Sequence, residues 1–374
     1  MIIKSLELLD YRNYENLQMS FDEGINILYG DNAQGKTNIL ESIYVCATTK
    51  SHRGSKDKEM IRFGNEDSHI RMYVEKDKIE HKIDIHLKKN KTKGAAVDGI
   101  PIKKSSELMG MINVVFFSPE DLAIIKSGPA ERRHFIDMEL CQLNKVYLHD
   151  ISSYNKVVNQ RNNLLKQTHY QESLKSTLDV WDEQLVRYGI RVIKEREKFI
   201  ETLNALIYPI HKKLSGEKEN LNIRYEPSID AKHFEEQLFL RRENDLRLKS
   251  TTIGPHRDDM GFYIDDMNVR RFGSQGQQRT AALSLKLSEI YLVQKKIKDL
   301  VKLMIKDTPI LLLDDVLSEL DSFRQNYLLE SIRQIQTIIT CTGLDEFIQN
   351  RFNIDKVFRV KDGSIVNQQE VKDE

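Results

Sequence analysis

The chain has 374 residues, of which 40% are hydrophobic and 30% charged, values typical of a globular protein long enough for two domains. Basic and acidic residues balance at 57 each, so net charge excludes no class of partner, and any basic surface must be local. Three distant cysteines argue against a disulfide framework or zinc knuckle. No signal peptide or membrane-length apolar run is found, so we expect a cytoplasmic protein with no membrane partner.

The first third of the chain has the pattern of strands around one glycine-rich turn. A short strand is expected at residues 2–9, and a second, at 24–29, runs directly into the turn. From Thr37 onward, apolar residues recur at helical spacing. Residues 68–103 alternate as in an antiparallel sheet, and residues 113–117 form a continuous apolar strand.

The pattern changes at about residue 131. Up to residue 213, glycine and proline are almost absent and apolar residues recur at helical spacing, which predicts several helices. Further on, a helix is expected from about Gly276, and strands are expected at 221–225, 260–264, 309–313 and 336–342. We therefore expect an α/β fold with mixed sheets and helices. Residues 1–120 and 215–374 would form one domain, and residues 121–214 an inserted α-helical domain.

The glycine-rich turn fits the pattern G-x-x-x-x-G-K-[ST], with a strand before it and a helix after it. Its glycines let the backbone wrap around phosphate groups, and the helix N-terminus adds a favourable dipole. Lys36 would contact the β- and γ-phosphates of ATP, and Thr37 would bind Mg²⁺. The alternative is a chance glycine-rich turn. The predicted nucleotide-binding residues of this loop are Gly30, Asp31, Asn32, Ala33, Gln34, Gly35, Lys36 and Thr37.

A second apolar strand, ILLL at residues 310–313, ends in the acids Asp314 and Asp315. Functional groups in parallel sheets gather at the carboxyl ends of the strands. Asp314 would reach Mg²⁺ through water, and Asp315 would orient the water that attacks ATP. The alternative is a strand followed by a solvated turn.

The sequence FGSQGQQR at residues 272–279 starts a helix. The hydroxyl of Ser274 and the N–H groups around Gly276 suit an anion. Because residues 30–37 already form a complete phosphate cradle, this second anion site is explained if it serves ATP held by another copy of the chain. The alternative is a plain helix cap.

The order of these motifs, completed by SELD at residues 318–321, resembles the ABC-type ATPase heads of the SMC family. More narrowly, the chain resembles the RecF family of bacterial recombination mediators. That likeness is carried by LLDYRNY at residues 8–14, FSPEDL at 117–122, GPAERRHFID at 128–137 and TIGPHRDD at 252–259. SMC proteins and ABC transporters do not share the whole set.

The resemblance implies an ABC-type P-loop ATPase head with an inserted helical domain in place of the SMC coiled coil. It implies a role in DNA repair, DNA replication and the SOS response to DNA damage. The protein would bind double-stranded and gapped DNA, dimerise with ATP and hydrolyse it weakly, in a DNA-dependent way, as a switch. With RecR and RecO it would help to load recombinase. By motif, Lys36, Asp314 and Asp315 are catalytic, Thr37 and Asp314 hold Mg²⁺, and Ser274 and Gly276 meet the partner subunit's ATP.

Some positions depart from the wider ABC pattern. Asp315 stands where a glutamate is usual, and the side chain, one methylene shorter, predicts slow hydrolysis. Glu120 stands where a glutamine is usual. Residues 340–342 (TCT) contain no switch histidine, so the group that senses the γ-phosphate stays open.

Several other side chains have two interpretations. The first is contact with DNA phosphates, and the second is a solvated surface or internal salt bridges. These cations are Lys126, Arg132 and Arg133, then Arg53, Lys56 and Lys58, then Arg241 and Arg242. His256 and Arg257 would contact DNA or nucleotide, or belong to a structural loop, and Arg12 would touch phosphate or adenine.

Three other functions fit parts of the pattern. One is an SMC-like head of another DNA-tethering system, although an insertion of roughly eighty residues is too short for a long coiled-coil arm. Another is a P-loop enzyme acting on a small molecule, which would leave the motifs at residues 274–277 and 318–321 without a role. A third is a non-catalytic scaffold that holds ATP permanently.

Overall fold

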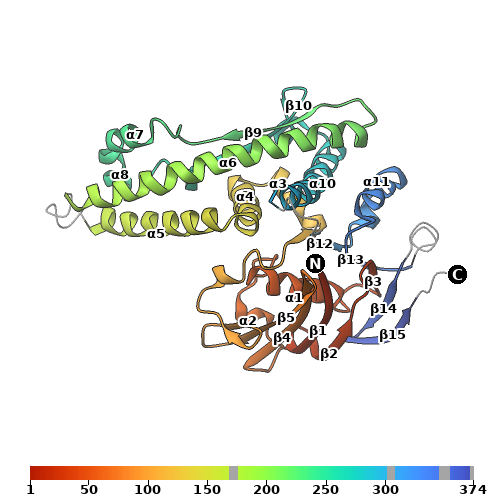
Figure 1. Ribbon diagram of the computed structural model, residues 1–374. Coiled ribbons are helices and arrows are strands. Elements are labelled where there is room, and N and C mark those ends of the chain that lie inside the picture. The colour runs from red at the N-terminus through yellow and green to blue at the C-terminus, as the bar shows by residue number, and fades with distance from the viewer. Residues whose placement is uncertain (168–175, 301–307, 345–353, 371–374) are drawn as a thin grey trace. The chain divides into compact units, whose positions relative to one another are not determined.

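The computed structural model describes residues 1–167, 176–300, 308–344 and 354–370. The chain folds into two compact units. Unit 1 contains Met1–Asp121 and Glu289–Glu374, and unit 2 contains Leu122–Ser288. Each unit is described by itself below, with the element labels of Figure 1.

The first sheet of unit 1 is antiparallel and has the strand order β2-β1-β4-β5-β6-β7. Inward and outward residues alternate along its long strands, because successive side chains of a strand point to opposite faces. In β4, for example, Ile70 and Met72 are buried, while Arg71 lies between them on the outer face. The strands are β1 (Ile2–Tyr11), β2 (Tyr14–Ser20), β4 (Asp67–Lys76), β5 (Ile79–Lys88), β6 (Gly94–Val97) and β7 (Ile100–Pro101).

The second sheet of unit 1 has the order β15-β14-β3-β13-β12-β8 and is parallel except at β15. Strands β12 and β13 at its centre are buried along their whole length, as expected for strands covered on both faces. The strands are β3 (Ile25–Tyr29), β8 (Val114–Phe117), β12 (Ile310–Asp314), β13 (Thr337–Cys341), β14 (Lys356–Lys361) and β15 (Ser364–Glu370).

Helix α1 (Lys36–Thr48) packs between the two sheets (Figure 1). One apolar cluster joins its buried residues, such as Ile39 and Ile43, to Met72 of the antiparallel sheet and Leu312 of the parallel sheet. The sheet–helix–sheet core fixes the start of α1 beside the carboxyl ends of the parallel strands. Two more helices belong to this unit, α2 (Asp57–Met60) and α11 (Ser322–Ile332).

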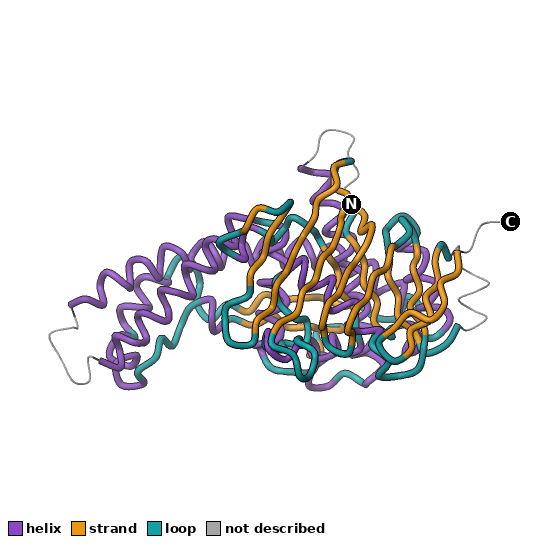
Figure 2. Tube along the Cα trace, turned by 90° about the horizontal axis from the view of Figure 1, so that it is seen from below, coloured by secondary structure: helices purple, strands orange, loops and turns teal. Residues whose placement is uncertain are grey.

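Unit 2 is mainly helical and includes one small antiparallel sheet, β11-β10-β9. Helices α5 and α6 lie side by side in both views (Figures 1 and 2). The helices are α3 (Leu122–Lys126), α4 (Pro129–Leu143), α5 (Lys145–Gln167), α6 (Leu178–Leu214), α7 (Phe234–Leu240), α8 (Arg242–Leu248) and α9 (Val269–Phe272). The strands are β9 (Leu221–Glu226), β10 (Asp259–Ile264) and β11 (Met267–Asn268), and α10 (Gln275–Leu300) starts in this unit and ends in unit 1.

The two units differ from the domains expected from sequence. The helical region was expected at residues 121–214, whereas unit 2 continues to Ser288 and includes the β9–β10 sheet. The reason is local packing: α6 contacts β9, and α4 contacts β10, so the strands belong with the helices. No helix in the described ranges is both long and apolar enough to cross a membrane.

Candidate nucleotide-binding site

The phosphate loop (residues 30–37) leaves β3 and enters α1. Gly30 and Gly35 have φ values of 151° and 114°, which other residues rarely adopt. A Cβ on Gly30 would lie 2.2 Å from the Val360 carbonyl oxygen, and one on Gly35 would lie 2.6 Å from Asn13 Nδ2. Both positions therefore require glycine for reasons of conformation and of space.

Lys36, the first residue of α1, is buried at 6% exposure. Its Nζ donates to the carbonyl oxygens of Gly30, at 2.5 Å, and Asp31, at 2.9 Å. These contacts hold the ammonium against the backbone of the loop, while Asp31, Asn32 and Ala33 at the loop tip are exposed. A buried ammonium beside the N–H groups of a helix start attracts an anion such as a phosphate.

Thr37 and Asp314, which are 277 positions apart, are in direct contact. The Thr37 hydroxyl donates to Asp314 Oδ1 at 2.8 Å, and the Thr340 hydroxyl donates to the same oxygen at 2.7 Å. The contact follows from the sheet order, since β13 lies between β3 and β12. A hydroxyl and one carboxylate are donors that suit Mg²⁺, which takes few protein oxygens and keeps water and phosphate for its other ligands. The residues therefore fit the ion.

Asp315 lies just beyond β12 with a φ of 56° and has a buried Oδ1 without a hydrogen-bond partner in the described structure. Its backbone N–H donates to the Thr340 hydroxyl oxygen at 3.0 Å. Burial raises the pKa of its carboxyl, and Asp314 adds to the rise while Lys36 opposes it. A carboxylate oxygen without a protein donor can accept a hydrogen bond from water, which is the role proposed for Asp315.

Gln34 is held by two hairpins that sequence reasoning did not connect with the site. Its carbonyl accepts from Asn13 Nδ2, at 2.9 Å, in the turn between β1 and β2. Its side-chain Oε1 accepts from the N–H of Asp362, at 2.6 Å, in the turn between β14 and β15. The Asp362–Gly363 dipeptide is a recognised hairpin signal, but nothing in it points to a contact more than three hundred residues away.

Arg12, expected to touch phosphate or adenine, makes its described contacts with other protein groups. Its guanidinium forms a two-point ion pair with the fully buried Glu41 of α1, at 2.7 and 2.6 Å. Burial alone would raise the pKa of Glu41, but hydrogen bonds from Arg12 and Ser51 hold it below its ordinary value. The pair fixes the β1–β2 turn to α1, which keeps Asn13 beside the loop.

Ser274 and Gly276 belong to unit 2 and are exposed at the start of α10. Ser274 and Gln277 form a reciprocal cap: Gln277 N–H donates to Ser274 Oγ at 3.2 Å, and Ser274 N–H donates to Gln277 Oε1 at 2.8 Å. The amide nitrogen of Gln277 then donates to Glu219 at 2.9 Å. The helix cap is thus present, and its exposed hydroxyl and N–H groups also suit an anion.

Several cations considered for DNA contact are committed to contacts within the protein. Arg132 is buried and forms a two-point pair with Asp259, at 2.6 and 2.9 Å. Arg133 donates to the Asp258 carbonyl at 2.7 Å, and Arg242 donates to Asp182 at 2.6 Å. For Arg132 and Arg242 the structure supports the salt-bridge interpretation over the phosphate one, and Arg133 is held by a backbone carbonyl.

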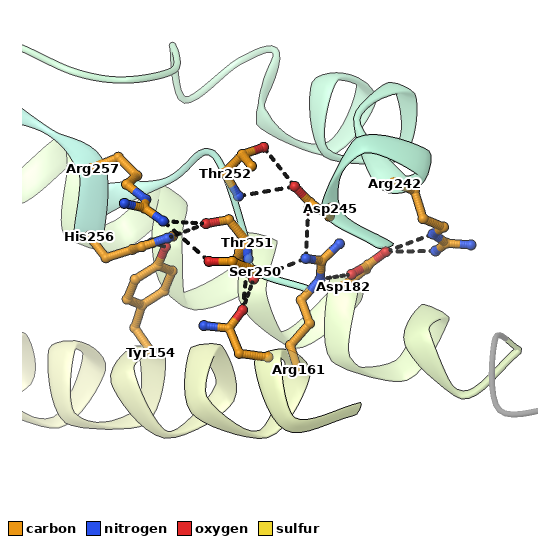
Figure 3. A network of polar contacts seen from close by, with 11 residues as sticks. Tyr154, Arg161, Asp182, Arg242, Asp245, Ser250, Thr251, Thr252, His256 and Arg257 are labelled. Atoms are coloured by element: carbon orange, nitrogen blue, oxygen red, sulfur yellow. Dashed lines mark hydrogen bonds and ion pairs between the residues drawn. The ribbon is translucent and has the colours of Figure 1, made fainter. Parts of the chain in front are cut away.

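His256 lies inside a polar network of unit 2 (Figure 3). Its Nε2 is 3.0 Å from the Thr251 carbonyl oxygen, and its Nδ1 is 2.7 Å from the Tyr154 hydroxyl. A carbonyl can only accept, so Nε2 carries the proton and Nδ1 accepts from Tyr154. Arg257 also contacts the Thr251 carbonyl, at 3.3 Å. His256 and Arg257 therefore stabilise the loop formed by residues 252–259 through contacts within the protein. Burial lowers the pKa of His256 to about 4.

A phosphate loop, a central parallel sheet and an acid pair at the end of β12 define an ABC-type ATPase head. A family model described as RecF/RecN/SMC N terminal domain matches residues 2–366. A solved Smc head, bound to the C-winged helix domain of ScpA, superposes with a TM-score of 0.57 at 16% identity, covering 100% of this chain and 98% of that one. That likeness establishes the fold.

Relatives that match nearly the whole chain identify the family within this class of ATPase heads. The chain is 61% identical over 370 residues to the DNA replication and repair protein RecF of Lachnospira eligens, covering 98% of this chain and 100% of the relative. Identity to RecF of Lachnoclostridium phytofermentans is 61% over 365 residues, covering 98% and 99%. A solved structure of the recombination mediator protein RecF-ATP in the RecFOR pathway has a TM-score of 0.90 at 34% identity, covering 99% and 98%. The chain therefore belongs to the RecF family of DNA replication and repair proteins.

Proposed function

We propose that this chain is an ATP-dependent DNA-binding switch of recombinational repair. One subunit binds ATP with residues 30–37, and Mg²⁺ is held by Thr37 and Asp314. Ser274 and Gly276 of a second copy meet the γ-phosphate and close a homodimer. The dimer binds double-stranded and gapped DNA and acts with RecR and RecO. These partners are inferred from the solved relative, which is described as a mediator in the RecFOR pathway.

The observation that carries the proposal is the contact among Thr37, Asp314 and Thr340. The start of α1 supplies one hydroxyl, the end of β12 a carboxylate and β13 a second hydroxyl, beside a buried ammonium. A hydrophobic or structural role would not require this set of polar groups, whereas a magnesium–phosphate complex uses every one of them.

Hydrolysis is slow and serves to release the dimer. The Asp315 carboxylate is one methylene shorter than a glutamate, so a water between it and the γ-phosphate is less closely held. DNA stimulates the reaction by favouring the dimer, because the complete site needs residues from both copies.

Light scattering with no nucleotide, with ADP and with ATP, each with and without duplex DNA, tests the proposal. We expect a mass of 43.7 kDa without ATP and roughly twice that with ATP. Lys36→Ala should remove the ATP-dependent dimer because the phosphates lose their principal cation. An ATP-driven dimer that survives this substitution would contradict the role given to the loop.

A further inference from the structure

Two loops of unit 1 carry a concentration of positive charge that the nucleotide site does not use. Residues 49–58 connect α1 to α2 and include the first two residues of α2. They contain four Lys or Arg and one acid, Asp57. Residues 88–93, between β5 and β6, hold four lysines and no acid. Sixteen residues thus carry seven excess positive charges in a chain whose net charge is zero.

The two loops form one surface because Lys93 joins them. Its Nζ donates to Asp57 Oδ1 at 2.8 Å and also to the Thr49 carbonyl. Among the other cations of the two loops, Arg53, Lys56, Lys58, Lys89 and Lys91 are exposed. Several exposed Lys and Arg side chains on one surface suit a chain of phosphates, which releases counterions when it is bound.

An exposed aromatic ring lies in a third segment that contacts the same surface. Phe63 is 102% exposed, more than any other large apolar side chain in the described residues. Its turn is closed by the Asn65 N–H on the Arg62 carbonyl, at 3.1 Å, and Glu66 of that turn pairs with Lys89 at 3.0 Å. Exposing a whole ring to water is unfavourable, and a base is a flat partner that covers such a ring without needing a pocket.

Resting on the DNA-binding function proposed above, we propose that residues 49–58, 61–66 and 88–93 form a cationic surface for single-stranded DNA. Arg53, Lys56, Lys58 and Lys91 bind phosphates, and Phe63 stacks on an unpaired base. This combination of charge and an aromatic ring fits a single strand, since the bases of a duplex are stacked inside it. The surface would engage the unpaired stretch of gapped DNA.

Fluorescence anisotropy of the full chain with ATP tests the charges, using three labelled probes: a single strand, a blunt duplex and a gapped duplex. Lys91→Gln should weaken binding to the single strand and the gapped duplex several-fold and reduce the salt dependence by about one phosphate contact. The matched control is Lys78→Gln, which removes the same charge at the other end of β5, roughly 30 Å away along the strand. It should change neither quantity.

Phe63→Ala tests the ring. It should weaken binding to the single strand and the gapped duplex about tenfold and leave the blunt duplex unchanged, because only unpaired bases stack on it. Phe239→Ala is the control, since Phe239 is also exposed, at 66%, but lies on α7 of unit 2. Light scattering of each variant with ATP checks that the dimer still forms.

The possible results separate the two proposals. A wild-type chain that binds DNA, with Lys91→Gln and Phe63→Ala binding all probes equally well, would overturn the cationic surface alone. Equal loss on duplex and single strand for Phe63→Ala would also overturn it, because stacking would not be the cause. A wild-type chain that binds none of the probes would overturn the DNA-binding function as well.

Discussion

Thr340 holds the carboxylate of Asp314 and the backbone of Asp315 with one hydroxyl group. That hydroxyl donates to Asp314 Oδ1, at 2.7 Å, and accepts from the Asp315 N–H, at 3.0 Å. Thr340 itself is fully buried, so no water can replace these contacts without a change of structure. We infer that it is a positioning residue, which sets the acids for Mg²⁺ and for water.

Thr340→Val should therefore lower the rate of ATP hydrolysis by roughly tenfold, about the value of one hydrogen bond to a charged group. The Mg²⁺ concentration for half-maximal rate should rise, because Asp314 loses a donor that orients it. ATP affinity measured without Mg²⁺ should stay the same. Steady-state hydrolysis over a Mg²⁺ series gives both quantities.

Thr340→Ser is the matched control, because serine keeps the hydroxyl and loses only a methyl group. It should restore the Mg²⁺ dependence of the wild type. If the serine variant behaves like the valine variant, packing of β13 and not the hydroxyl explains the loss.

At the scale of elements, the start of α10 carries two roles that the structure alone does not separate. Ser274 caps the helix. In the proposed function it also contacts the γ-phosphate of the ATP that the other copy binds. Asp and Asn are both good caps, so a pair of substitutions can keep the first role and vary the second.

Ser274→Asp should abolish the ATP-dependent dimer, since a negative charge would face the γ-phosphate, whereas Ser274→Asn should retain it. ATP binding by the monomer should be unchanged in both, because the phosphate loop lies elsewhere in the chain. Light scattering and nucleotide titration measure these effects. Dimers of equal stability in both variants would leave Ser274 as a helix cap only.

Local patterns predicted the elements that surround the site. The strand before the phosphate loop, the helix after it and the apolar strand before Asp314 are found as β3, α1 and β12, because each is specified by its own residues. Strand β2 and the β14–β15 hairpin were not predicted. The pattern of β2 is weak, although it pairs with the neighbouring β1, and the place of β14 depends on β3, far away in the chain.

Contacts between distant segments account for what the sequence could not predict at the site. Thr340 was noted only for the lack of a histidine nearby, because its contact with Asp314 depends on the register of β13 against β12. Asn13 and Gln34 likewise meet only when two hairpins fold over the loop. The motif predicted which residues line the loop, and tertiary packing determined what holds them.

At the scale of the whole molecule, the two ends of the chain build unit 1, and the middle builds unit 2. Unit 2 contains a buried polar network beside its apolar residues. Arg161, which is fully buried, donates to Asp182 at 2.5 Å and to Asp245 at 2.7 Å (Figure 3). Removing one partner of such a network would leave a buried charge unpaired, which is strongly destabilising.

The same network makes the stability of unit 2 dependent on pH through His256. Its folded pKa of about 4 lies below the ordinary value of 6.5, so the unfolded chain takes up a proton first as the pH falls. Stability is therefore complete above about pH 6.5 and is lost as the pH falls toward 4. The loss should be at most about 1.4 kcal/mol for each pH unit in that window.

His256→Gln should flatten this dependence, because glutamine keeps a donor for the Thr251 carbonyl but does not titrate. The single tryptophan, Trp181, lies in α6, so its fluorescence during urea unfolding follows unit 2. The free energy of unfolding of the wild type should fall between pH 7 and pH 5. That of the variant should fall less, and the difference is the contribution of one titrating group. His149→Gln is the control, since it removes another imidazole of the same unit, one that pairs with Asp150 and makes none of the contacts of His256. If both variants follow the wild type equally, groups other than His256 control the acid stability of this unit, and its buried imidazole is not the titrating group.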